Sequence, residues 1–239
     1  NFPLVVFLPV GYFGITMQTV SGGFLINLEG GEGCGKTSQI PYLVNYLREN
    51  GFRVFPTREP GGTSIGEQIR EVIHSLKNVE IHPRTETLLF QAARAQIVEQ
   101  VIKPRLGDGE IVICDRFFDS TVAYQGFGHN QDIARINLLI DYATTGLTPD
   151  LTILLDVDPE VGQSRKRGSN EWNRMDAMDK DFHKRVRDGY LKMADIDARW
   201  IVVNANNGIE KVRTDLIKET TKRLSLIGLI ESELKNIER

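Results

Sequence analysis

Eight consecutive residues near the start of the chain have the types and spacing of a phosphate-binding loop. They fit the pattern G-x-x-x-x-G-K-[ST] at every fixed position and are Gly30, Gly31, Glu32, Gly33, Cys34, Gly35, Lys36 and Thr37. Glycines let the backbone curl so that several N–H groups point at one anion, and the following helix adds partial positive charge. Lys36 is expected to reach the β- and γ-phosphates, and the Thr37 hydroxyl to hold Mg²⁺. The pattern predicts a protein that uses a nucleoside triphosphate; a plain glycine turn is the alternative.

Charged residues at the ends of predicted strands favour a second anion site beside this loop. Asp115 follows an apolar run, where a carboxylate reaches Mg²⁺, usually through water. A turn-capping aspartate is the other interpretation. Arginines lie at strand ends, on helices and in a basic run: Arg58, Arg70, Arg94, Arg116, Arg165, Arg167 and Arg174. One such arginine alone is usually a solvated surface residue, but the group predicts a site for a second phosphorylated molecule.

The elements that position these residues alternate between strands and helices. Apolar runs predict five strands, at 24–28, 52–55, 111–114, 151–156 and 200–203. Apolar residues at helical spacing predict helices at 38–50, 64–76, 85–106, 132–144, 182–194 and 209–237. This alternation predicts an α/β fold: a doubly wound, five-stranded parallel sheet flanked by helices, with ligands bound beyond the carboxyl ends of the strands.

Three stretches carry more specific expectations. The helix at 64–76 is expected to bury Ile65, Ile69, Val72, Ile73 and Leu76. The run 118–128 is polar and rich in glycine. A basic stretch with little apolar pattern predicts a mobile lid at about 162–176, within a single domain that spans 17–239.

Composition and charge exclude several function classes. The 239 residues carry a net charge of −3, so we expect no nucleic-acid partner. Two cysteines, Cys34 and Cys114, are too few for a disulfide framework, which favours a cytoplasmic protein. No window contains the roughly 18 apolar residues of a membrane span, so we expect no membrane partner. Residues 1–16 are uncharged, precede Met17 and are expected to be a non-native or disordered extension; an extra edge strand or a membrane-surface anchor is the alternative.

Further motifs, taken with the glycine loop, resemble the thymidylate kinase (dTMP kinase) family. They are Thr57-Arg58-Glu59-Pro60-Gly61-Gly62, Phe90-Gln91-Ala92-Ala93-Arg94, Asp115-Arg116-Phe117, Ser120-Thr121, Tyr124-Gln125-Gly126 and Pro149-Asp150-Leu151. The ordered match covers residues 24 to about 203. The resemblance implies a P-loop nucleoside-monophosphate-kinase fold, ATP with Mg²⁺ as phosphoryl donor, dTMP as acceptor, dTDP and ADP as products, and a homodimer.

The resemblance also implies which residues bind the base of dTMP. Phe90 would stack on thymine, although an aromatic residue on a helix is more often part of the core. Arg94 would bond to the carbonyl edge of thymine, and Gln125 with Thr121 would also address the base. Tyr124 would lie under the deoxyribose, where a 2′-hydroxyl would clash.

Sugar, phosphate and catalytic roles follow in the same way. Glu32 would approach the 3′-hydroxyl, while Arg58, Arg70 and Arg116 would hold the acceptor phosphate. The family has two forms, with a catalytic basic residue either in the phosphate loop or in the lid. Positions 31–34 hold no basic residue, so this chain resembles the lid form. The implied catalytic group is Lys36, Asp115, Arg116 and the two lid candidates, Arg165 and Arg167.

Two departures from the family pattern leave details open. Phe117 stands where the family has His or Tyr, and the lid ends Asn173-Arg174-Met175-Asp176 instead of Asp-Arg-x-Glu. A lid carboxylate role at Asn173 or Asp176 is therefore open. Two other functions also remain open: a kinase for another nucleotide or deoxynucleoside, and a P-loop nucleotide switch. The guanine motif N-K-x-D of GTPase switches does not occur in the sequence.

Overall fold

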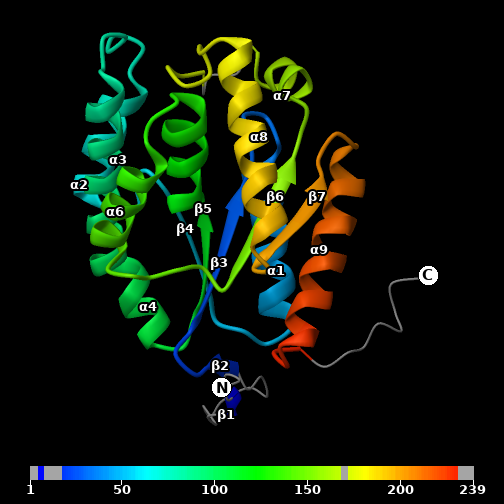
Figure 1. Cartoon of the computed structure of the whole chain (residues 1–239). Coiled ribbons are helices and arrows are strands. Elements are labelled where there is room, and N and C mark those ends of the chain that lie inside the picture. Colours follow the sequence, from blue (N-terminus) through cyan, green and yellow to red (C-terminus); the bar gives the residue numbers. More distant parts are fainter. Residues whose placement is uncertain (1–4, 8–17, 168–171, 231–239) are drawn as a thin grey trace.

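A five-stranded parallel sheet forms the centre of the molecule (Figure 1). The computed structural model describes residues 5–7, 18–167 and 172–230. The strands run in the order β4-β5-β3-β6-β7, and every neighbouring pair is parallel. Their bounds are β3 (Phe24–Glu29), β4 (Val54–Arg58), β5 (Ile111–Asp115), β6 (Leu151–Asp156) and β7 (Trp200–Asn204). The predicted sheet is confirmed, and its central strand, β3, leads directly into the glycine loop.

Helical segments connect the strands. The α-helices are α1 (Lys36–Glu49), α2 (Ser64–His74), α3 (Pro83–Ile97), α4 (Lys103–Gly107), α5 (Phe118–Thr121), α6 (Ile133–Thr144), α7 (Pro159–Lys166), α8 (Lys180–Ile196) and α9 (Ile209–Leu226). Two π-helical segments, η1 (Val98–Ile102) and η2 (Val122–Gly128), continue α3 and α5. The sequence predicted one regular helix at 85–106; instead η1 interrupts it. Pro104 explains the interruption, since its ring would clash with the carbonyl of Gln100 in a regular helix.

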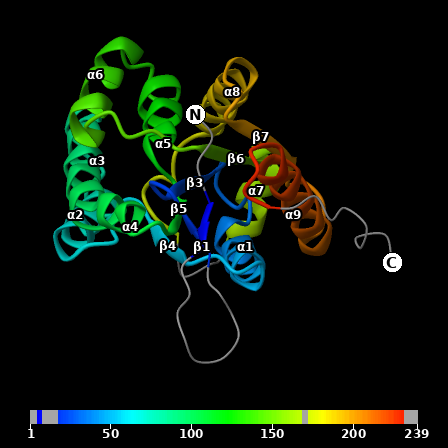
Figure 2. The same cartoon turned by 90° about the horizontal axis from the view of Figure 1, so that it is seen from below.

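The helices cover both faces of the sheet (Figure 2). On one face, Ile26 and Ile113 belong to a core shared with α1 and α9. On the other face, Leu25 and Val112 pack with the helical stretch 83–107, and Leu154 packs under η2 and α8. Successive strand side chains point to opposite faces, so strands covered on both faces must be apolar throughout. The stretch 118–128, which the sequence showed only as polar and rich in glycine, is helical because its Val122, Ala123 and Tyr124 are buried.

Helix α2 differs from the sequence expectation in what it buries. Ile73 is fully buried, but Ile65, Val72 and Leu76 are about half exposed, at 51%, 44% and 53%. The reason is position: α2 lies at the edge of the molecule and packs chiefly on α3, which packs in turn on α6 (Figure 1). The expectation that this helix buries all five of its apolar residues is therefore wrong.

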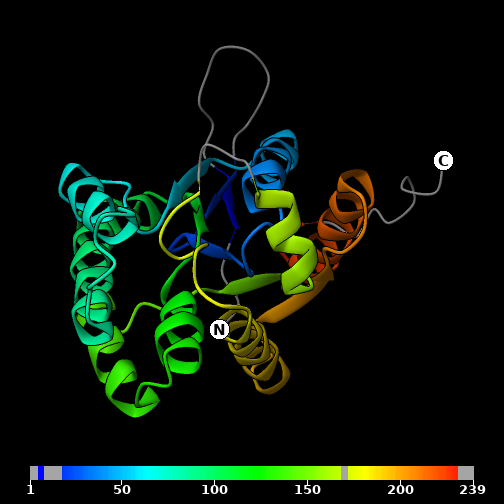
Figure 3. The ribbon, with the colours of Figure 1, turned by 90° about the horizontal axis from the view of Figure 1, so that it is seen from above.

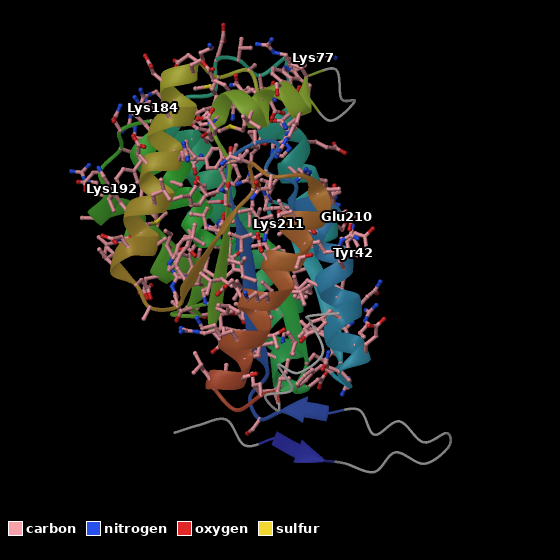
Figure 4. The ribbon with its side chains drawn as sticks, turned by 90° about the vertical axis from the view of Figure 1, so that its right-hand side faces the viewer. Tyr42, Lys77, Lys184, Lys192, Glu210 and Lys211 are labelled. Atoms are coloured by element: carbon pink, nitrogen blue, oxygen red, sulfur yellow. The ribbon has the colours of Figure 1, made fainter. Side chains whose placement is uncertain are left out.

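The two ends of the chain lie at the limits of the described residues. Residues 5–7 (β1, Val5–Phe7) pair in antiparallel fashion with β2 (Gln18–Val20), as a separate ribbon at the end of the sheet remote from the glycine loop (Figure 4). The remainder of the expected extension, 1–4 and 8–16, lies outside the described residues. Helix α9 ends at Leu226, short of the expected 237, and Gly228 follows with φ 75°, a conformation that terminates helices. Residues 231–237 lie outside the described residues.

Candidate active site

The glycine loop joins β3 to α1 and forms one wall of a cavity of about 460 Å³. Gly33 and Gly35 have φ of 68° and 93°, which residues with a Cβ rarely adopt, so the pattern needs glycine there. Lys36 is the first residue of α1 and is 8% exposed. Its Nζ lies 3.3 Å from the carbonyl oxygen of Gly30 and 3.4 Å from Cys34 Sγ. The loop amides, the lysine and the N-terminus of α1 thus converge on one place that suits a phosphate chain.

A second, larger cavity of about 710 Å³ lies over the carboxyl ends of β3, β4 and β5. Figure 3 views the ribbon from this end of the sheet. Its walls contain all but one of the residues implied for acceptor binding: Glu32, Arg58, Arg70, Phe90, Arg116, Thr121, Tyr124 and Gln125. The three arginines come from the end of β4, from α2 and from the end of β5. Phe90, Thr121 and Gln125 come from α3, α5 and η2. The cavity therefore combines cationic side chains with an aromatic ring and an amide, as binding of a nucleotide requires.

Arg94, the remaining residue of that set, lies outside the cavity lining. It is 1% exposed and forms a buried ion pair with Glu59, with Nε donating to Oε2 over 2.8 Å. Its terminal nitrogens donate to Gln91 Oε1, Thr121 Oγ1 and the carbonyl oxygen of Phe117. Burial raises the pKa of the Glu59 carboxyl to about 7, although the charge of Arg94 opposes that rise. In this structure Arg94 donates a hydrogen bond to Thr121, which lines the acceptor cavity, but does not line that cavity itself.

The two cavities share four lining residues, Glu32, Lys36, Thr37 and Lys166. Glu32 lies at the centre of this junction. Its Oε1 accepts hydrogen bonds from Tyr124 OH at 2.7 Å and Arg116 Nη2 at 3.1 Å, and its Oε2 accepts one from Lys166 Nζ at 2.9 Å. Burial alone would raise the pKa of this carboxyl, but Arg116, Lys166 and Lys36 hold it well below its usual range. The junction therefore holds an ionised carboxylate among cations.

Arg116 is fixed more tightly than the other arginines of the acceptor cavity. Its φ is 70°, uncommon for a residue with a side chain, which indicates a functional constraint on the turn after β5. Besides Glu32 and Tyr124, its guanidinium donates to Ser120 Oγ and Tyr190 OH, both at 3.2 Å. By contrast, Arg58 is half exposed, and its Nη2 lies 3.0 Å from both carboxylate oxygens of Glu67.

Comparison with known proteins identifies the family to which this arrangement belongs. A family model described as thymidylate kinase matches residues 28–216. The chain belongs to the thymidylate kinase family. This result confirms the resemblance inferred from the motifs.

Individual members of the family match over nearly their whole length. The thymidylate kinase of Geotalea daltonii is 45% identical over 212 residues, covering 85% of this chain and 99% of that protein. The thymidylate kinase of an Exiguobacterium species is 42% identical over 208 residues, covering 87% and 98%. The crystal structure of thymidylate kinase from Ehrlichia chaffeensis is similar, with a TM-score of 0.66 and 35% identity over 83% of this chain and 99% of that one.

The lid cations that the family resemblance singled out lie apart from one another. Arg165 lines the smaller cavity, where its guanidinium donates to the carbonyl oxygens of Ala205, Asn206 and Asn207 at 2.7–3.2 Å. Arg167 lines a separate outer hollow of about 350 Å³. Residues 168–171 of the expected lid lie outside the described residues. Neither arginine reaches the junction in this structure.

Two residues at or beneath the site, Lys166 at the junction and Glu29 in the core, were not singled out from the sequence. Lys166, the last residue of α7, bridges Glu32 and Asp176; its Nζ is 2.6 Å from Asp176 Oδ1. The run Arg165-Lys166-Arg167 signals only that some cation lies here. Glu29, the fully buried last residue of β3, accepts hydrogen bonds from the backbone N–H groups of Phe117 and Ser120 at 2.9 and 3.2 Å. The sequence does offer a signal for Glu29, because it is an acidic residue at the end of an apolar run that predicts a strand.

Arg174, also grouped with the lid arginines, lines neither the glycine-loop cavity nor the acceptor cavity. It is buried, its Nε donates to the carbonyl oxygen of Ile73 at 2.9 Å, and it forms an ion pair with Glu86 on α3. The grouping of Arg94 and Arg174 with the other arginines of a second anion site stays a prediction; in this structure each forms a buried ion pair with a glutamate.

Proposed function

We propose that the protein transfers the γ-phosphoryl group of ATP to dTMP, giving dTDP and ADP. The observation that carries this proposal is that the glycine-loop cavity and the arginine-lined cavity share the wall formed by Glu32, Lys36, Thr37 and Lys166. A triphosphate in the first cavity and a monophosphate in the second would meet at that wall. Membership of the thymidylate kinase family supports dTMP as the acceptor and ATP as the donor.

The reaction needs positioning and charge neutralisation more than covalent chemistry from the protein. An oxygen of the dTMP phosphate attacks the γ-phosphorus while the bond to the β–γ bridging oxygen breaks, and ADP leaves. The attacking oxygen is already anionic, so no general base is required. Lys36 and the loop amides hold the donor; Arg58, Arg70 and Arg116 hold the acceptor phosphate. Arg165 and Arg167 remain our candidates for the lid arginine that stabilises the transferring group.

Mg²⁺ is part of this proposal, and the residues present fit it. Thr37 has its side chain exposed where the cavities meet, and the Asp115 carboxylate lines the acceptor cavity without a hydrogen bond to any described residue. The described residues contain no cluster of three or more His, Cys, Asp or Glu side chains that would hold a metal without help. Mg²⁺ keeps several waters and binds through substrate phosphates, so a hydroxyl and one carboxylate suffice. When bound, it would neutralise charge on the donor phosphates.

Selection of the acceptor would rest on the inner end of the larger cavity. The half-buried Phe90 ring offers a stacking surface, and Thr121 and Gln125 offer polar groups at the base. The Tyr124 hydroxyl donates to Glu32 at 2.7 Å, which holds the phenol ring where the sugar would lie. A 2′-hydroxyl would meet this ring, so the site favours deoxynucleotides.

A coupled assay of ADP release tests the proposal across dTMP, dUMP, dCMP, dGMP and thymidine. We expect the highest kcat/KM with dTMP, and no turnover once Mg²⁺ is chelated. Preference for thymidine over dTMP would instead identify a nucleoside kinase, since a 5′-hydroxyl needs a general base. ADP release that does not depend on any monophosphate would contradict the proposal.

We also propose that two copies of the chain form a homodimer through the surface of α2, α3 and α6. Several large apolar side chains of these helices are exposed: Ile65, Val72, Leu88, Leu138 and Tyr142. Leu138 and Tyr142, one turn apart on α6, are 73% and 86% exposed. Contiguous exposed apolar side chains mark interaction sites, and isologous pairing of one surface is the commonest form of oligomer. Sedimentation at twice the chain mass of 27.0 kDa is the expected result; sedimentation as a monomer at micromolar concentration would contradict it.

We place the protein in the cytoplasm. Cys34 and Cys114 are both free and buried, as expected of reduced thiols. Among the described residues, each helix is too short or too polar to cross a membrane.

A further inference from the structure

Gln125 lies at the base end of the acceptor cavity with its amide held from behind. The residue belongs to η2, lines the cavity and is 1% exposed. Its Nε2 donates a hydrogen bond of 2.7 Å to Oε1 of Glu86 on α3. The amide oxygen, Oε1, accepts no hydrogen bond from the described residues. One edge of the amide is thus occupied by Glu86, and the other edge faces the cavity with its acceptor free.

Glu86 is fully buried and does not line the cavity. Arg174 forms an ion pair with its Oε2, and His129 Nε2 lies 3.2 Å from its Oε1. Burial alone would raise the pKa of this carboxyl, but His129, Arg174 and Gln125 together hold it below its usual range. The carboxylate is therefore ionised near neutral pH, and an ionised carboxylate only accepts hydrogen bonds.

This acceptor determines which way round the Gln125 amide lies. A free glutamine amide can turn over and exchange its carbonyl oxygen with its NH₂ group. Turned over, Gln125 Oε1 would face Glu86 Oε1, and two acceptors would oppose each other in a buried place. The cost of such a contact exceeds that of an ordinary lost hydrogen bond, since one partner is charged.

The fixed orientation distinguishes between pyrimidine bases. Thymine and uracil present an N3–H donor beside a carbonyl acceptor, which complements an amide with its oxygen opposite N3. Cytosine presents an N3 acceptor beside an NH₂ donor, and would need the amide turned over. An amide free to turn would serve both kinds of base; the amide held by Glu86 serves only the first.

We propose that Glu86 is a positioning residue that fixes the Gln125 amide and thereby makes the acceptor site select pyrimidines that carry an N3–H over cytosine. The inference rests on the proposed function, because it concerns the base of the same acceptor. Arg174 and His129 contribute by keeping Glu86 ionised and in place. The C-terminal end of the expected lid is thus tied, through Arg174, to the residue that sets base selection.

The test compares kcat/KM for dTMP and for dCMP in the whole protein and its variants. In Glu86→Gln the new amide can either accept or donate, so Gln125 can turn over. We expect the ratio of kcat/KM for dTMP over dCMP to fall about tenfold or more, mostly through a gain with dCMP, since one buried hydrogen bond is worth roughly that factor. The matched control is Arg174→Lys, which keeps a cation beside an intact carboxylate and should keep the wild-type ratio.

A second variant keeps the inference testable if Glu86→Gln fails to fold. Gln125→Met removes the amide but preserves its length, and it should also lose the preference for dTMP over dCMP. A wild-type ratio in either folded variant, Glu86→Gln or Gln125→Met, would overturn the inference and leave the proposed function standing. Wild-type protein that phosphorylates none of the monophosphates would instead overturn the proposed function. Thermal unfolding of each variant confirms that the ratios come from folded protein.

Discussion

Replacement of Arg116 by alanine should remove most of the activity while the fold survives. The guanidinium lies at the junction of the two cavities, where its nitrogens contact Glu32 Oε1, Tyr124 OH, Ser120 Oγ and Tyr190 OH at 3.0–3.2 Å. An arginine held in this way at a transferring phosphoryl group is worth about 10³-fold or more in rate, or about 4 kcal/mol of transition-state stabilisation. Alanine has the same φ preferences as other residues with a Cβ, so the turn at φ 70° is no more strained than before.

The assay is coupled ADP release with dTMP as acceptor, together with thermal unfolding. We expect kcat/KM to fall about 10³-fold or more, and the unfolding midpoint to fall by only a few degrees, since Lys166 and Tyr124 still contact Glu32. Arg116→Lys should be intermediate, because lysine keeps the charge but loses the planar fork. The matched control is Arg105→Ala on α4, whose guanidinium lies 4.2 Å from the ring centroid of Phe55 at the far end of the sheet. Near-normal turnover in Arg116→Ala would refute this account of the site.

Three further predictions concern the glycine loop, a buried carboxyl and the exposed helical face. Gly33→Ala should abolish activity and lower the unfolding midpoint, because its Cβ would lie 2.0 Å from the carbonyl oxygen of Gly162. The control is Gly107→Ala, whose Cβ would meet nothing within 4 Å. A Gly33→Ala variant with wild-type activity and stability would contradict the loop geometry. The Glu59 carboxyl has a pKa of about 7 in the folded protein against an ordinary 4.5, so the stability it contributes is present at low pH and is lost as pH rises through 7. Between pH 6 and pH 8 the wild type should therefore lose about 1 kcal/mol more unfolding free energy than Glu59→Gln; parallel denaturation profiles would show that Glu59 does not titrate there. Leu138→Glu, on the exposed face of α6, should yield a monomer in sedimentation, whereas a dimer of unchanged affinity would move the interface elsewhere.

The sheet was predictable because its strands are covered on both faces. The run 111–114 is apolar without interruption and 151–155 is broken only by Thr152, as is typical of strands in a parallel sheet. The arginines at strand ends were predictable for a related reason. Arg58 and Arg116 end or follow strands whose carboxyl ends meet at one edge, so the second cavity follows from strand positions alone.

Pairings between distant residues could not be read from the sequence. The sequence grouped Arg94 and Arg174 with the arginines of an anion site and did not show that each is buried against a glutamate, 35 and 88 residues away respectively. The sequence also overestimated burial on α2, because helical spacing of apolar residues does not distinguish a core face from a face left for a partner.

Of the three consecutive cations Arg165, Lys166 and Arg167, only Lys166 contacts Glu32. The packing of α7 against the glycine loop decides this. Gly162 on α7 and Gly33 in the glycine loop approach so closely that neither has room for a side chain. This contact sets the rotation of α7, and Lys166 then faces Glu32 while Arg165 faces the carbonyl oxygens of 205–207. A run of basic residues predicts a charged segment, but only the packed helix shows the direction of each side chain.

The central claim is that the two cavities bring a triphosphate and dTMP together for direct phosphoryl transfer. Phosphorus NMR of wild-type protein with ATP, Mg²⁺ and dTMP tests this most directly, since it resolves every phosphorus species at once. The account predicts that ADP and dTDP appear in equal amounts, that dTMP declines at the same rate and that little inorganic phosphate forms. Accumulation of ADP and inorganic phosphate with dTMP unchanged would contradict it, because the glycine loop would then serve hydrolysis and the arginine-lined cavity would not hold the acceptor.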